Sequence, residues 1–149
     1  MTSNSVREDT IKAVLGKVFR LYVQSQCYHW NVEGPNFRSL HAMFETQYQT
    51  LSGFNDAVAE RLRVLGIKAP ESLDELLALS NTAQDTTART ADEMLATHCA
   101  GFQSFNDALR DAIQVLADVR DDGTVAVMSN ILEWSEKEHW MMSASRQAG

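Results

Sequence analysis

The chain has 149 residues, with 13 Lys and Arg against 20 Asp and Glu, and a formal net charge of −7. This length suits one domain, residues 1–149, that can bury a core, and the low content of glycine (7) and proline (2) excludes a collagen-like or disordered chain. The acidic balance argues against sequence-independent binding to nucleic-acid phosphates, which needs a surface rich in Lys and Arg. It is compatible with a cation as partner, and also with solubility alone.

No apolar run approaches the roughly 20 residues that a membrane span needs. The first residues lack the basic and apolar regions of a signal peptide. Cys27 and Cys99 lie far apart and form no CxxC motif, which predicts free, buried thiols in a reducing compartment. We therefore expect a cytoplasmic protein with no membrane-spanning part.

The first half of the chain predicts two long helices and one short helix. Two segments, separated by Gly34-Pro35 and ending before Gly66, carry apolar residues at steps of three and four. They are Ile11, Val14, Leu15, Val18, Phe19 and Tyr22 in the first, and Leu40, Phe44, Tyr48, Leu51, Phe54, Val58, Leu62 and Leu65 in the second. Ser72 and Glu75 then predict a capping box that opens a brief helix through Leu79.

Two more long helices are predicted after a polar connection over residues 80–92 that runs into the next helix start, with a break at Asp121-Asp122-Gly123 between them. Their apolar residues are Leu95, Phe102, Phe105, Leu109, Ile113 and Leu116, and then Met128, Ile131, Leu132, Trp134 and Met142. The pattern predicts an all-α four-helix bundle with a short extra helix between helices two and three. The long connection from 66 to about 88 allows a crossover, which is the ferritin-like arrangement.

The candidate metal ligands are two histidines and two acids. His29 and His41 flank the first turn and could approach each other across it, while Asp56 and Glu60 stand one turn apart on one face of the second helix. Imidazole with carboxylate is a ligand set for iron, zinc or manganese. A single histidine on a helix is more often a surface or core residue than a ligand, and the two acids alone could form a solvated acidic stripe.

Helix geometry decides how these residues could meet. His41 and Asp56 are 15 residues apart, or roughly 22 Å along a helix, so they cannot bind one ion within a chain. They nevertheless lie on similar faces. Two copies of the second helix, packed antiparallel about a two-fold axis, would place His41 of one chain beside Asp56 and Glu60 of the other. The resulting hypothesis is an inter-subunit metal site formed by His29, His41, Asp56 and Glu60.

A rival site would lie inside one chain. Glu136 and His139 have the Glu-x-x-His spacing that di-iron bundles use, but those proteins need the motif twice and no second copy occurs. We interpret Glu136 and His139 as surface or interface residues. His98 and Cys99 receive no role: a secondary metal site and simple core packing both stay open.

Residues 29–45, which read HWNVEGPNFRSLHAMFE, resemble the signature of the Dps family of dodecameric mini-ferritins, and the register continues through residues 56–66. The resemblance implies a hollow shell of twelve subunits. It also implies ferroxidase sites between two-fold partners, with His29 and His41 from one chain and Asp56 and Glu60 from the other. Trp30 matches a tryptophan beside that site. Family members bind Fe(II), oxidise it preferentially with hydrogen peroxide and store Fe(III) mineral.

Asp121 and Asp122 are similar to the acidic turn that the family places near a pore for iron entry, with Asp118 as a further candidate. Where the family often has an aspartate, this chain has Ala126, so the pore ring would be less acidic. The family's second activity, DNA binding, often uses a lysine-rich tail. This chain has four lysines and no such tail, so we expect weak or absent DNA binding. The alternatives are a DNA-compacting protein and a metal-free helical oligomer.

Overall fold

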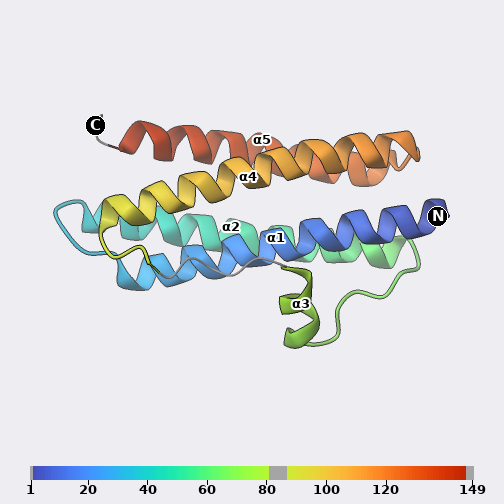
Figure 1. The fold of residues 1–149 in the computed structure, drawn as a ribbon, viewed down its shortest axis with the longest axis horizontal. Helices are drawn as coiled ribbons and strands as arrows, with labels where there is room; N and C mark the ends of the chain where they lie inside the picture. Colours follow the sequence, from blue (N-terminus) through green and yellow to red (C-terminus); the bar gives the residue numbers. More distant parts are fainter. Residues whose placement is uncertain (1, 81–86, 147–149) are drawn as a thin grey trace.

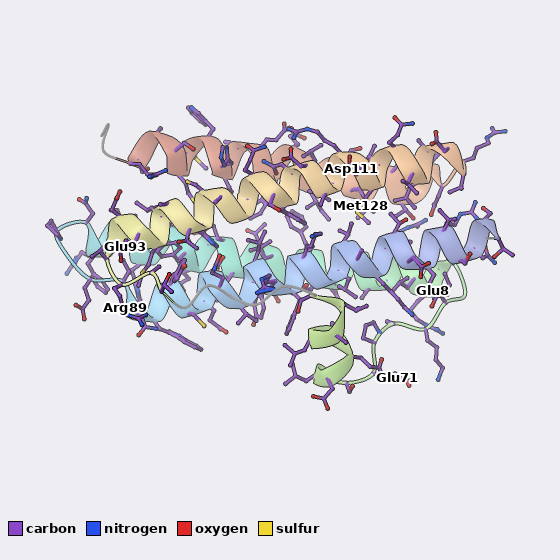
Figure 2. All side chains as sticks on the ribbon, in the orientation of Figure 1. Glu8, Glu71, Arg89, Glu93, Asp111 and Met128 are labelled. Carbon is purple, nitrogen blue, oxygen red and sulfur yellow. The ribbon has the colours of Figure 1, made fainter. Side chains whose placement is uncertain are left out.

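The computed structural model describes residues 2–80 and 87–146, and within them it contains five helices and no strand (Figure 1). The helices are α1 (Ser3–Asn31), α2 (Phe37–Val64), α3 (Leu73–Leu79), α4 (Ala91–Asp118) and α5 (Asp122–Ser145). The prediction of four long helices with a short one after the second is confirmed. No helix in the described ranges is long and apolar enough to cross a membrane.

The order of the helices in space follows from the connections between them. α1 and α2 form an antiparallel hairpin across Gly34, whose φ of 114° is a conformation that favours glycine. α2 ends near the beginning of α1, whereas α4 begins at the opposite end of the bundle (Figure 1). α2 and α4 therefore run in the same direction, and the expected crossover between them is confirmed. α5 then returns antiparallel to α4.

The apolar faces of the four long helices form one core. Its largest fully buried hydrophobic side chains are Phe44, Phe102, Ile11, Leu15, Leu51, Leu62, Leu109, Leu116, Met128, Ile131 and Met142. Each such burial stabilises the fold by roughly 1.5–3 kcal/mol. α3 lies against α1 at Gly16, where an added Cβ would come within 2.3 Å of the Leu79 carbonyl oxygen. This close approach requires glycine at that position.

The helix starts differ in part from the prediction. Ser72 caps α3 by accepting from the Glu75 backbone N–H at 3.2 Å, but the Glu75 carboxylate accepts from Glu71 instead, so the predicted capping box is incomplete. A complete box opens α4 at Thr90 and Glu93. Bonds from the backbone N–H groups of Thr90 and Arg89 lower the pKa of Glu93. α4 thus begins at Ala91, where the predicted connection runs into the next helix.

The last break lies earlier than Asp121-Asp122-Gly123. The chain turns at Arg120, which has a φ of 57°, and α5 begins at Asp122, so Gly123 belongs to its first turn. Gly123 therefore does not form the turn. An added Cβ at Gly123 would lie 2.8 Å from a guanidinium nitrogen of Arg61, so its absence makes room for that side chain.

Candidate metal centre

His29 and His41 form a reciprocal pair across the α1–α2 turn. Nδ1 of His29 lies 2.8 Å from the backbone oxygen of His41, and Nδ1 of His41 lies 2.7 Å from the backbone oxygen of His29. The two rings stack with centroids 3.7 Å apart and planes 17° apart. The expectation that these histidines approach each other across the turn is confirmed.

These hydrogen bonds determine which nitrogen of each ring remains free to bind a metal ion. A carbonyl oxygen accepts hydrogen bonds but cannot donate them, so both Nδ1 atoms carry the proton and donate. In each neutral ring, Nε2 then keeps its lone pair, which is the donor that a metal ion uses. Tyr48 packs edge-on against His29, and Phe37 stacks on His41, so the orientation of both rings is fixed by neighbours.

Asp56 and Glu60 lie farther along α2, and both side chains are exposed. The described part of the chain contains no group of three or more His, Cys, Asp or Glu side chains that could hold a metal ion. One subunit therefore does not bring the four candidate ligands together. The inter-subunit site predicted from the helix geometry stays a prediction. Trp30, beside His29, is also exposed, with 64% of its surface accessible.

The rival Glu-x-x-His motif lies apart from this pair. The Glu136 carboxylate is exposed and pairs with Arg110 at 2.7 Å, while His139 is half-buried. Among the described residues no second pair of ligands joins them. Glu136 thus lies at the surface, as interpreted from the sequence.

A polar chain that the sequence analysis missed crosses the bundle interior at His98. Nε2 of His98 lies 2.9 Å from Ser25 Oγ and 3.1 Å from Gln47 Oε1, while the Gln24 side-chain amide lies 2.9 Å from Nδ1. The Gln47 Nε2 group donates to Glu138 Oε2 at 2.9 Å. Gln24, Gln47 and Glu138 occupy core positions at helical spacing, and polar residues in that register were the available signal.

The burial of His98 gives the first testable prediction. The ring is fully buried, and desolvation lowers its pKa from 6.5 to about 3. Between these values the unfolded chain binds a proton that the native protein does not, so stability is full above pH 6.5 and falls as the pH drops towards 3. We expect His98→Gln, compared by denaturant unfolding at pH 7.5 and 5, to lose less stability on acidification than the parent. Equal losses in the two proteins would contradict this assignment.

The aspartates near the last turn differ in their exposure to solvent. Asp121 is buried and caps α5: its carboxylate accepts from the Thr124 backbone at 3.2 Å and from the Thr124 hydroxyl at 2.7 Å. Arg61 also donates to it, at 3.4 Å. Asp122 and Asp118 are exposed instead. Of the expected pore acids, Asp122 and Asp118 are therefore the ones with accessible carboxylates.

The two cysteines are both free in the structure. Cys99 is buried, as expected, whereas Cys27 is only half-buried, which corrects the prediction of a buried thiol there. Burial raises the pKa of both thiols.

Comparison with known proteins shows which proteins this chain resembles in sequence and fold. A family model for the ferritin-like domain matches residues 8–147. A "DNA protection during starvation protein" of Brevibacillus brevis is 33% identical, with 83% of each chain covered. A crystal structure of a Dps protein from Bacillus brevis superposes with a TM-score of 0.89 at 29% identity, covering 97% of this chain and 98% of the other. A Dps protein from Vibrio cholerae, described as a member of the ferritin-like diiron-carboxylate superfamily, gives 0.87 at 27%, covering 95% and 89%.

The fold and these matches define the class: this is a ferritin-like protein. Within that class the chain belongs to the Dps family.

Proposed function

We propose that the protein is a ferroxidase that oxidises Fe(II), preferentially with hydrogen peroxide, and stores the Fe(III) product as mineral in a shell of twelve subunits in the cytoplasm. The observation that carries the proposal is the His29–His41 pair, in which both Nδ1 atoms are used by carbonyl oxygens and both Nε2 atoms are left as ligands. Membership of the Dps family supports the same site.

In this proposal each metal site forms between two subunits. His29 and His41 of one chain would face Asp56 and Glu60 of its two-fold partner, because no described residue of their own subunit completes a group of three ligands with the exposed acids on α2. The imidazoles hold Fe(II), and the carboxylates favour the Fe(III) product because hard oxygen ligands stabilise the higher charge. Trp30 lies beside the site on the adjoining position of α1. This arrangement needs a homo-oligomer.

Peroxide is the oxidant that the resemblance to the Dps family implies, and the electrons balance with it. Hydrogen peroxide accepts two electrons, one from each of two Fe(II) ions, and its O–O bond is cleaved to the level of water without release of hydroxyl radical. Iron would enter past the exposed Asp122 and Asp118, while Asp121 holds the beginning of α5 in place. The net charge of −7 per chain would concentrate cations at such a shell.

Iron oxidation kinetics and particle mass test the proposal together. We expect Fe(II) added anaerobically to be oxidised rapidly when peroxide is supplied and much more slowly in air alone, followed by Fe(III) absorbance. Twelve chains of 16.7 kDa give a particle of about 200 kDa in sedimentation analysis. Oxidation no faster than in protein-free buffer, or a monomeric particle, would refute the proposal.

DNA compaction is the competing function, and charge argues against it. With 13 basic residues against 20 acidic ones, the chain offers few phosphate contacts to release counterions. We expect no band shift of duplex DNA at nanomolar protein in about 150 mM salt, where electrostatic attraction beyond about 8 Å is screened. A shift under those conditions would show that a DNA-binding surface exists despite the acidic balance.

A further inference from the structure

A cavity of about 420 Å³ lies where the beginning of α2 meets the last turns of α5. Its walls include Leu40, Met43, Leu95 and Met141, and Glu138 lines it from α5. A second cavity of about 590 Å³ shares Leu40 and Leu95 with it and adds Glu33, Asp92 and Arg89. The two volumes are within the usual size range of small-molecule sites. The feature that needs an explanation is the carboxylate inside.

Glu138 is a buried carboxylate with half of its acceptor capacity unused. The residue is only 8% exposed. Oε2 accepts from Gln47 Nε2 at 2.9 Å, whereas Oε1 makes no hydrogen bond or ion pair with any described residue. Oε1 keeps contact with solvent, and because Glu138 lines the cavity, a ligand bound there can reach this oxygen.

The polar chain behind Glu138 orients its carboxylate as an acceptor. Ser25 Oγ donates its own proton to the Leu21 carbonyl, and its oxygen lies 2.9 Å from His98 Nε2, with Gln47 Oε1 3.1 Å from the same nitrogen. The Gln47 amide nitrogen is thereby turned towards Glu138 and donates to it. Gln47 thus occupies Oε2, which leaves Oε1 as the acceptor that a group in the cavity can use.

The residues that line the cavity determine which kind of cation it can bind. A metal ion bound here would have one carboxylate and few other charged ligands, and the described residues contain no group of three or more metal-ligating side chains. The apolar walls suit methylene groups instead, and Ser39 and Asn36 at the cavity offer oxygen acceptors for an N–H group. The Asn36 side chain makes no capping bond to α2, so its oxygen is available. The adjoining cavity has two carboxylates, Glu33 and Asp92, against one guanidinium, Arg89, so its charge balance favours a second ammonium group only weakly.

We propose that the α2–α5 cavity binds an alkylammonium ligand of the linear diamine or polyamine class, with the ammonium group paired to Glu138. The site is separate from the His29–His41 pair, so diamine binding can be tested whether or not the ferroxidase proposal is correct. Glu138 contributes the charge, Leu40, Met43, Leu95 and Met141 contact the methylenes, and the Gln47–His98 chain holds the carboxylate.

Calorimetric titration of the assembled protein with 1,4-diaminobutane tests the proposal, with 1-butanol as the uncharged probe. We expect the diamine to bind and the alcohol to give no signal. Glu138→Gln keeps an oxygen that can accept from Gln47 but removes the charge, so it should weaken diamine binding by about ten- to a hundredfold. Glu136→Gln on the same helix removes an exposed charge paired with Arg110 and should leave the affinity unchanged.

A second variant keeps the test decisive if Glu138→Gln folds poorly. Met141→Lys places a resident ammonium three residues from Glu138 on the same helix, where it can occupy the carboxylate and exclude the added diamine. Loss of diamine binding in this variant, with peroxide-driven iron oxidation retained, would support the site. The proposal would be overturned if the diamine did not bind, or if Glu138→Gln bound it as tightly as the parent. It would also be overturned if the alcohol bound equally well, or if Mn²⁺ at one equivalent per chain displaced the diamine.

Discussion

Peroxide-driven oxidation of Fe(II) is expected to fall by at least about 100-fold in His41→Ala. Loss of residues that merely orient metal ligands costs 10–100-fold, and here a ligand itself would be removed. The substitution also removes the ring stacked on His29 and the donor to the His29 backbone oxygen, so the remaining ring would be held only by the backbone oxygen of residue 41 and by Tyr48. Stopped-flow absorbance at saturating peroxide measures the effect. His139→Ala, which removes the other half-buried histidine, should retain the parental rate.

The same reaction can show whether the site is shared between subunits. His41→Ala retains both acids, and a double variant Asp56→Ala, Glu60→Ala retains both histidines. Each homogeneous shell should be inactive. If the two chains are mixed one to one before assembly, half of the two-fold pairs are hybrid and each has one intact site of two, which restores about one quarter of the parental sites. A site within one chain would recover no activity, and that result would refute the inter-subunit arrangement.

The other large effect is on stability, at the junction of α1, α2 and the beginning of α5. We expect Asp121→Ala to reduce the free energy of unfolding by about 3 kcal/mol and the midpoint of thermal unfolding by roughly 10 °C. The carboxylate caps α5 through Thr124 and is the acceptor for Arg61, with Arg7 3.9 Å away. Both arginine side chains are only 20% exposed, so removal of the acid leaves two poorly solvated positive charges.

Asp122→Ala is the matched control for this prediction. The neighbouring carboxylate is exposed and makes no ion pair with the described residues, so its loss should change stability by less than about 0.5 kcal/mol. Thermal scans at one protein concentration are required, because assembly makes the midpoint depend on concentration. Similar midpoints for the two variants would mean that the buried acid does not stabilise this junction.

The bundle was predictable from sequence because its signals are local. Apolar residues at steps of three and four indicated every long helix, and Gly34-Pro35 indicated the first turn. One boundary was predicted wrongly. The last turn lies at Arg120, and Gly123 makes room for Arg61 instead of forming the turn. That contact joins residues 62 positions apart, and no local pattern encodes it.

The sequence by itself determined the helical class, the long connection that permits a crossover, and the four residues that we propose as iron ligands. Spacing along a helix is fixed by 3.6 residues per turn, so a linear pattern was enough to place His41 and Asp56 on similar faces and too far apart for one ion. The tertiary structure decided which nitrogen of each histidine is available, that Asp121 is a buried structural acid, and that Glu138 has an unpaired oxygen in a cavity. These properties depend on hydrogen bonds and burial between distant segments. Only the packed chain defines them, because the same side chain is a ligand, a cap or a buried charge according to its neighbours.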